Sequence, residues 1–173
     1  ATQLSQNNEI NVLRRNMKIG IFAGSFCPVT VGHVDAIRRA AKLVDKLYVV
    51  VGVNIAKKYV MPDEARLQSV VAATSDIPNV ECALHKGLLV DYARKVGATV
   101  MIKVVRNATE TDEVLTLVDI NRDMWEGETV FIAADRNLRH VSSSLVRELA
   151  LLGKDYSAYV PQAALPIVKN YFG

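Results

Sequence analysis

Residues 17–33 read MKIGIFAGSFCPVTVGH. The first half of this stretch predicts a strand, and the small residues Ala23-Gly24-Ser25 after it let the backbone turn sharply. A helix should follow from about Gly32, because apolar residues recur there at helical spacing. Unpaired N–H groups and the helix dipole make such a helix start favourable for phosphate, and His33 in its first turn can donate to a phosphate oxygen. The alternative is a buried loop with a capping histidine.

Strands and helices alternate along the rest of the chain. The predicted strands are 47–51, 80–84, 99–103 and 129–133, and the predicted helices are 62–73, 88–96, 110–125, 142–152 and 161–170. This alternation is typical of an α/β fold with a doubly wound, parallel, five-stranded sheet and right-handed crossovers. Ligands bind such sheets at the carboxyl ends of their strands.

The composition indicates one globular domain, residues 17–173, after a polar tail, residues 1–16, for which we expect disorder. Half of the 173 residues are hydrophobic and 23% are charged, as in soluble proteins. No apolar run is long enough to span a membrane, and the first sixteen residues do not resemble a secretory signal. Cys27 and Cys82 lack metal-ligand spacing and fit reduced cytoplasmic thiols. A net charge of +3, with acidic residues interspersed, does not call for nucleic acid.

Two further groups of residues could bind anions. Ser142-Ser143-Ser144 stand at a predicted helix start, where hydroxyls and unpaired N–H groups make either a second anion site or a simple helix cap. Lys57, Lys103 and Arg106 follow two of the predicted strands, so they should meet at the carboxyl edge beside His33. The other two histidines are isolated, and we predict no metal site made by the protein alone.

These segments resemble the nucleotidyltransferase superfamily and, within it, the phosphopantetheine adenylyltransferases. The opening motif of that family, Gly-(Ser/Thr)-Phe-Asp-Pro-(Ile/Val)-Thr-Asn-Gly-His, is matched at residues 24–33 except at Cys27 and Val31. A Lys-Lys pair is matched at 57–58, and a Gly-Leu-(Leu/Met) motif at 87–89. The sequence Ile-Ser-Ser-Ser-x-Val-(Arg/Lys)-Glu is matched at 141–148. The motifs keep their order from about residue 17 to residue 161.

The resemblance implies a Rossmann-like nucleotidyltransferase fold and an enzyme of coenzyme A synthesis. Such an enzyme transfers the adenylyl group of ATP to 4′-phosphopantetheine, with Mg²⁺ as cofactor, and releases dephospho-coenzyme A and pyrophosphate. The implied catalytic residues are His33, Lys57 and Arg106. The implied ATP contacts are Ser25, Phe26, His33, Val104, Val105, Arg106, His140, Val141, Ser142, Ser143 and Ser144. The implied phosphopantetheine contacts are Ser25, Lys57, Leu89 and Lys103.

The resemblance also has implications for partners. It implies a homo-oligomer, a hexamer in this family, and a cytoplasmic location. Coenzyme A is a candidate feedback ligand. No nucleic-acid or membrane partner is implied.

Four departures from the family pattern bear on substrate preference and turnover rather than on fold. Cys27 replaces an acidic residue, and Val31 replaces an asparagine. Lys103-Val104-Val105 replaces Arg-Gly-Leu before Arg106. Val114 stands where the family commonly has a glutamate that contacts nucleotide, and the adjacent Glu113 should point about 100° away round the helix.

Other functions therefore stay open. A non-catalytic or altered-specificity paralogue would bind nucleotide or coenzyme A without this turnover. Cytidylyltransferases and mononucleotide adenylyltransferases share the Gly-x-His motif but usually carry histidine where Thr30 stands, which argues against them. Release of pyrophosphate would separate the enzyme from a binding protein.

Overall fold

The computed structural model describes residues 3–173, and within the first helix it describes the side chains of residues 6–12. The strands are β1 (Ile19–Gly24), β2 (Lys46–Val53), β3 (Val80–Lys86), β4 (Val100–Val105) and β5 (Glu128–Ala133). The helices are α1 (Gln3–Asn16), α2 (Val31–Ala41), α3 (Asp63–Thr74), α4 (Leu89–Val96), α5 (Ala108–Met124), α6 (Ser143–Leu151), the short 3-10 helix η1 (Ser157–Tyr159) and α7 (Leu165–Phe172).

The five strands form one parallel sheet in the order β3-β2-β1-β4-β5. The predicted α/β fold is confirmed. The chain runs outward from β1 to β3, then returns across the sheet to pair β4 with β1, where Gly20 lies opposite Val100. A doubly wound sheet opens a crevice at such a reversal, outside the carboxyl ends of the strands.

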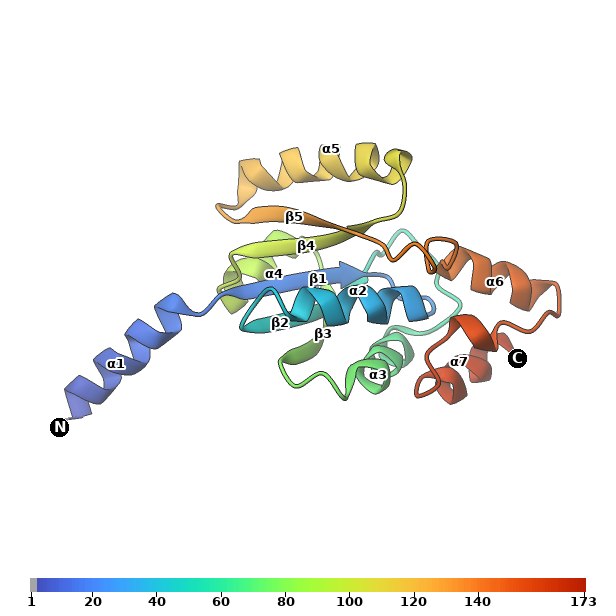
Figure 1. Ribbon diagram of the computed structural model, residues 1–173, viewed down its shortest axis with the longest axis horizontal. Helices are drawn as coiled ribbons and strands as arrows, with labels where there is room; N and C mark the ends of the chain where they lie inside the picture. The colour runs from blue at the N-terminus through green and yellow to red at the C-terminus, as the bar shows by residue number, and fades with distance from the viewer. Residues whose placement is uncertain (1–2) are drawn as a thin grey trace.

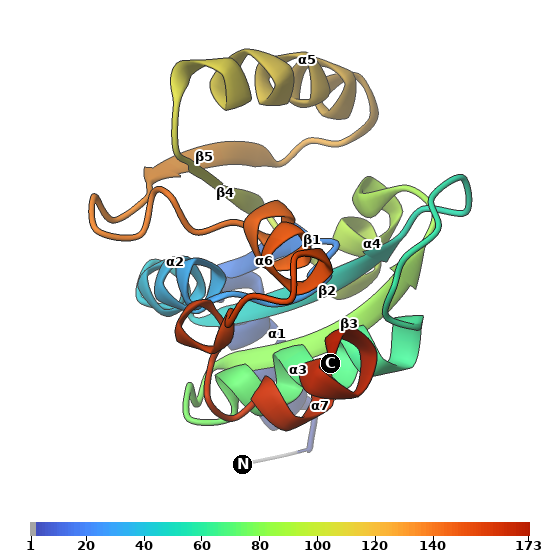
Figure 2. The ribbon, with the colours of Figure 1, turned by 90° about the vertical axis from the view of Figure 1, so that its right-hand side faces the viewer.

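Helices cover both faces of the sheet, and Figure 2 shows α2 and α4 on opposite sides. One core joins β2 to α2, α3, α6 and α7 through buried residues such as Ile37, Val49 and Val70. The second core packs Ile21 and Met101 against α4 and the end of α5. Side chains alternate across β4, so Met101 and Ile102 enter different cores.

Three expectations need correction. The segment expected to be a disordered tail forms α1 from Gln3, which extends away from the sheet (Figure 1); it contains neither Gly nor Pro, the two residues least favourable in a helix. Residues 1–2 of that tail lie outside the described part. Pro62 precedes α3 as its N-cap rather than lying in its first turn. The last helix begins at Leu165, after a turn at residues 162–164.

None of the described helices is long and apolar enough to cross a membrane.

Candidate active site

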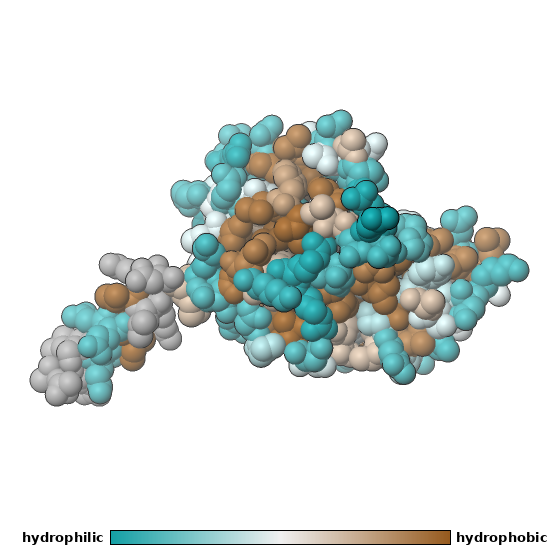
Figure 3. Space-filling model, viewed as in Figure 1, coloured by the Kyte–Doolittle hydropathy of each residue, from teal (hydrophilic) through white to brown (hydrophobic). Residues whose placement is uncertain are grey.

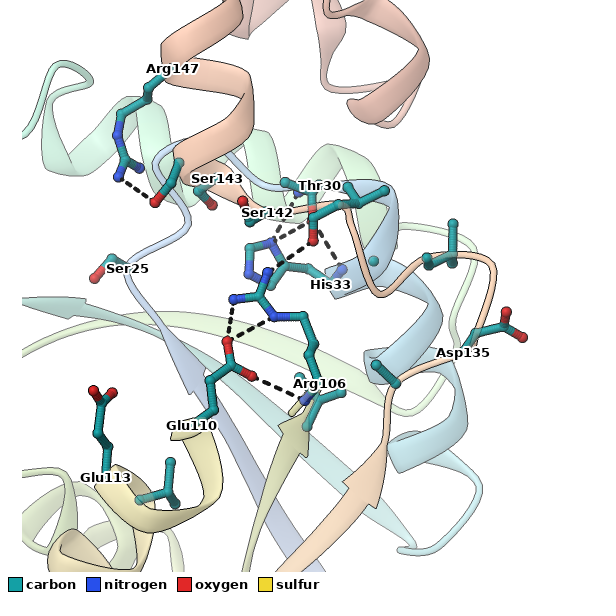
Figure 4. A pocket seen from close by; sticks show the side chains of 17 residues that line it. Ser25, Thr30, His33, Arg106, Glu110, Glu113, Asp135, Ser142, Ser143 and Arg147 are labelled. Atoms are coloured by element: carbon teal, nitrogen blue, oxygen red, sulfur yellow. Dashed lines mark hydrogen bonds and ion pairs between the residues drawn. The ribbon is translucent and has the colours of Figure 1, made fainter. Parts of the chain in front are cut away.

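A cavity of about 420 Å³ opens at the carboxyl edge of β1 and β4, between the N-termini of α2 and α6 (Figure 4). The N-terminal residues of α5 and the loop after β5 complete its wall. The lining residues are Ser25, Thr30, Gly32, His33, Val104, Arg106, Glu110, Glu113, Val114, Ala134, Asp135, Leu138, Val141, Ser142, Ser143, Ser144 and Arg147.

Thr30 and His33 form a capping box at the start of α2. The Thr30 hydroxyl accepts from the backbone N–H of His33 at 3.2 Å, and the backbone N–H of Thr30 donates to His33 Nδ1 at 3.0 Å. Because a backbone N–H can only donate, Nδ1 must carry a lone pair, and the proton of the neutral ring sits on Nε2. The capping contact thus leaves His33 with a distal N–H donor.

Burial, together with the nearby charge of Arg106, lowers the pKa of His33 to about 4. The imidazole is therefore neutral at pH 7 in the unliganded protein. The ring of Phe26 supports it edge-on, with centroids 4.9 Å apart. Phe26 has φ 49°, a conformation that non-glycine residues rarely adopt, and a Cβ on Gly24 would meet its ring at 3.2 Å. The turn after β1 thus fixes the position of the His33 ring.

Arg106, the first residue after β4, is held by Glu110 in the first turn of α5. Its Nε donates to Glu110 Oε1 at 2.8 Å, its Nη2 pairs with the same oxygen, and its backbone N–H donates to Oε2 at 3.0 Å. Its Nη1 donates to the carbonyl oxygen of Val141 at 3.1 Å. Burial alone would raise the pKa of Glu110, but these bonds and the charge of Arg106 lower it. The guanidinium is thus paired at the cavity wall.

The three serines at the start of α6 have three different partners. Ser142 is the N-cap, and its hydroxyl accepts from the backbone N–H of Leu145 at 3.0 Å. Ser143 donates to the carbonyl oxygen of Pro28 at 2.7 Å, and Ser144 accepts from Arg147 Nη2 at 3.2 Å. Capping and anion binding were left open as alternatives for these residues. Each hydroxyl makes a hydrogen bond within the protein. The backbone N–H groups at the start of a helix have no partner within the helix, and they point to the side where anions bind.

Two more cavities adjoin the first at Ser25. One, of about 370 Å³, is lined by Ser25, Cys27, Lys57, Lys58, Tyr59, Val60 and Arg147. The other, of about 430 Å³, is lined by Ser25, Gly52, Val53, Asn54, Ile55, Lys57, Tyr59 and Gly87. Because Ser25 borders all three cavities, ligands in different cavities could meet at this residue.

Relatives of the chain identify its family. The family model for cytidylyltransferase-like proteins matches residues 21–149. A phosphopantetheine adenylyltransferase of Lachnoclostridium phytofermentans is 39% identical over 157 residues, which cover 90% of this chain and 96% of the relative. Another, of Rubrobacter xylanophilus, is 40% identical with the same coverage of both chains. The chain belongs to the phosphopantetheine adenylyltransferase family.

Solved structures agree with the fold of this family. The structure of a bifunctional NMN adenylyltransferase/ADP ribose pyrophosphatase from Francisella tularensis, complexed with AMP and Mn, matches with a TM-score of 0.65 at 14% identity. The match covers 90% of this chain and 49% of that structure, so this chain spans about half its length. At this identity the likeness concerns the fold alone, and it supports the Rossmann-like nucleotidyltransferase fold.

The structure brings many of the residues implied by the family together. Ser25, His33, Val104, Arg106 and residues 141–144 line the first cavity, and Lys57 lines both of its neighbours. Phe26, Leu89, Lys103, Val105 and His140 lie outside these three cavities.

Each of these outlying residues has an observed position. The Phe26 ring lies beneath His33, and His140 packs edge-on against Tyr159 at 6.0 Å. Leu89 begins α4. Lys103 and Val105 alternate with Val104 along β4, so they point to the other face of the sheet, and burial lowers the pKa of Lys103.

Sequence reasoning missed several wall residues of the first cavity. Arg147 links α6 to the turn after β1, because its Nη1 donates to the carbonyl oxygen of Cys27 at 2.7 Å. The spacing of Arg106 and Glu110, four residues apart at a predicted helix start, could have indicated their ion pair. Glu113, expected about 100° round the helix from Val114, lines the cavity together with it, and Figure 4 shows Glu113 at the wall.

Proposed function

We propose that the chain transfers the adenylyl group of ATP to 4′-phosphopantetheine and forms dephospho-coenzyme A and pyrophosphate. The observation that carries this proposal is the first cavity, where two helix N-termini, His33 and Arg106 meet. Its two neighbours, lined by Lys57, share Ser25 with it. This arrangement offers separate places for a triphosphate and for a second phosphate-bearing substrate. The family name of the relatives supplies the identity of that second substrate.

Gly32 supports phosphate binding in the first cavity. A Cβ at this position would come no closer than 3.6 Å to its nearest neighbour, the Thr30 hydroxyl, which is an ordinary contact. Packing within the protein therefore does not require glycine here. A phosphate that approaches the backbone N–H groups of α2 does require it, because a side chain would occupy its place.

The reaction needs charge stabilisation more than proton transfer. The phosphate of phosphopantetheine is already an anionic nucleophile at neutral pH, so catalysis rests on alignment and on donors for the five-coordinate α-phosphate. His33 donates from Nε2 and Lys57 adds positive charge at this phosphate. Arg106 and the N-terminus of α6 hold the departing pyrophosphate. Each Nη of Arg106 carries a second hydrogen beyond its bond to Glu110 or Val141, and these hydrogens can donate to the pyrophosphate.

Lys103 is assigned to phosphopantetheine in this proposal, together with Ser25, Lys57 and Leu89. Its side chain leaves β4 on the face opposite Val104, and burial lowers its pKa, with no anionic partner among the side chains that the structure describes. A phosphate beside it would favour the charged ammonium.

Mg²⁺ is the proposed cofactor. Among the described residues no group of three His, Cys, Asp or Glu side chains could hold a metal ion. Mg²⁺ at nucleotide sites commonly takes one or two carboxylates, waters and the substrate phosphates, and the carboxylates of Glu113 and Asp135 at the cavity wall fit that mode. When bound, Mg²⁺ neutralises charge on the phosphates.

One assay tests the function. The protein is mixed with ATP, Mg²⁺ and phosphopantetheine, and dephospho-coenzyme A is sought by mass, with pantetheine and nicotinamide mononucleotide as control acceptors. An adenylylated product that forms with phosphopantetheine, and with neither control acceptor, supports the proposal. ATP binding without product from any acceptor would refute it.

The second candidate function is a paralogue that binds nucleotide or coenzyme A with lost or altered turnover. Two observations favour it: Val104 places a side chain in the cavity wall where the family has glycine, and Glu110 already pairs with Arg106. Release of pyrophosphate in the same assay would exclude the non-catalytic version.

We also propose that the chain forms a homo-oligomer, a hexamer, and that coenzyme A is its feedback ligand. The proposed location is the cytoplasm, where the free thiols of Cys27 and Cys82 would stay reduced. Apolar side chains gather on the face of the molecule in Figure 3. A groove of about 340 Å³ lies there, lined by Lys18, Leu43, Val44, Thr99, Val100, Ile102 and Val130. Exposed apolar patches of this kind commonly mark protein interfaces. Light scattering that returned a 19.0 kDa monomer at micromolar concentration would refute an oligomer.

A further inference from the structure

Arg66 in α3 is fully buried, with 0% of its side chain exposed, and it lines none of the three cavities. Its Nη1 donates to the carbonyl oxygens of Ser25 at 2.6 Å and Gly52 at 3.0 Å. Its Nη2 pairs with Asp63 at 2.7 Å, and its guanidinium lies 3.9 Å from the ring centroid of Tyr59. One buried cation thus contacts three segments that border the cavities.

Stability alone does not explain this residue. A buried guanidinium is expensive to desolvate, and a well-packed apolar side chain is often as stable in its place. Moreover, Arg66 Nε is buried and has no hydrogen-bond partner among the described atoms. An unpaired buried donor is itself destabilising. A requirement that the segments around Ser25, Gly52 and Tyr59 keep fixed relative positions would explain why a buried arginine is present.

The groups that Arg66 holds lie where the cavities meet. Ser25 follows β1 and borders all three cavities, while Gly52 lies near the end of β2 and borders the third. Tyr59 borders the two cavities that Lys57 lines, and residues 54–58 between Gly52 and Tyr59 are exposed. The guanidinium therefore anchors both ends of the exposed loop that carries Lys57 and joins them to the Ser25 turn.

We propose that Arg66 is a positioning residue that sets the placement of the Lys57 loop relative to the Ser25 turn, and so aligns the two substrates across Ser25. This inference rests on the proposed adenylyl transfer. Arg66 touches neither substrate in this role. Only arginine can serve it, because one planar fork reaches two carbonyl oxygens and a carboxylate, whereas lysine offers a single ammonium on a flexible stem.

The test compares Arg66→Lys with Val70→Ala, a matched control in the same helix. Val70 is fully buried in the core and is not part of any of the three cavities. Arg66→Lys should lower kcat by about 10- to 100-fold, since misplacement by about 1 Å can have that effect, while the Kd for ATP changes less than about threefold. Val70→Ala should lower Tm through its cavity and leave kcat unchanged at a temperature well below Tm.

Amide hydrogen exchange supplies a readout that does not depend on turnover. Amide exchange at residues 24–27 and 52–59 should become faster in Arg66→Lys and stay at its original rate in Val70→Ala. Unchanged kcat and unchanged exchange in a folded Arg66→Lys protein would overturn the inference. If Arg66→Lys does not fold, Asp63→Asn weakens the same anchor from its partly exposed side and should shift both readouts in the same direction; no shift would overturn the inference.

The same measurements separate this inference from the proposed function. An unmutated protein that makes no dephospho-coenzyme A would refute adenylyl transfer. In that case the exchange rates of the two segments would still decide whether Arg66 anchors them.

Discussion

His33 has two roles in one ring, and two substitutions should separate them. Its Nδ1 accepts from the backbone N–H of Thr30 at 3.0 Å, which stabilises the start of α2. Its Nε2–H is the proposed donor to the α-phosphate. Asparagine places an acceptor oxygen near the position of Nδ1 but cannot reach the position of Nε2. Alanine provides neither group.

The expected magnitudes follow from these contacts. Thr30 is 1% exposed as a residue, so His33→Ala leaves its buried N–H without an acceptor and should lower the free energy of unfolding by about 1 kcal/mol. His33→Asn keeps an acceptor and should lose less than half as much. Both variants lose the distal donor, so both should lower kcat by about 10²- to 10³-fold, or about 3–4 kcal/mol of transition-state stabilisation.

Two assays on each variant check this prediction. Urea unfolding gives the stabilities, and pyrophosphate release at saturating ATP and phosphopantetheine gives kcat. His33→Asn with near-original turnover would refute the proposed role of Nε2–H, because that variant lacks it. A loss of kcat in His33→Ala alone would point instead to the geometry of the α2 N-terminus.

Three further predictions concern charge in and beside the first cavity. The pKa of His33 is about 4 in the folded protein and about 6.5 in the unfolded chain, so the unfolded chain binds more protons between these pH values. Urea unfolding should therefore show that the free energy of unfolding falls by about 1–3 kcal/mol as the pH is lowered from 6.5 to 4, a range that allows for the open cavity beside the ring. His33→Asn should not show this fall. Lys103→Met should raise the KM for phosphopantetheine and lower kcat, while Lys103→Arg should preserve or improve kcat/KM; steady-state kinetics in which Lys103→Met is unchanged would contradict the role of this lysine. Glu110→Gln removes the charge that neutralises Arg106 and should tighten product inhibition by pyrophosphate about three- to fivefold, and an unchanged inhibition constant would indicate that Arg106 does not hold pyrophosphate.

The fold could be predicted from sequence because its signals are local. Val49, Val50 and Val51 mark a strand buried on both faces, and each strand is followed by a helical pattern long enough for a crossover. The N-terminal helix was missed because polar composition was interpreted as disorder, and the helix propensity of residues 3–16, which include four asparagines, is too mixed to indicate a helix. Element boundaries shifted at Pro62 and Leu165, where capping geometry rather than composition decides.

The site could be predicted only in part, for a physical reason. Parallel strands bring their carboxyl ends to one edge, so residues just after strands, such as Ser25 and Arg106, can be assigned to a site without knowledge of their contacts. Arg66 and Arg147 cannot be assigned this way. Arg66 donates to the carbonyl oxygen of Ser25, 41 positions away in the chain, and Arg147 to that of Cys27, 120 positions away. Because every residue has a backbone carbonyl group, the sequence does not show which one an arginine will bind.

The two helix starts that face the first cavity share an N-cap bond and differ in the side chain of their third residue. In each, a hydroxyl at the N-cap, Thr30 or Ser142, accepts the N–H of the third helical residue. This leaves the N–H groups of the first two residues for an anion. The third residue itself is His33 in α2 and Leu145 in α6. The third residue of α2 therefore adds a side-chain donor beside the backbone donors, which suits the phosphate where charge develops in the proposed reaction, whereas the third residue of α6 adds none. Capping and the proposed donor role of His33 are compatible, because the capping bond uses Nδ1 and leaves Nε2–H free.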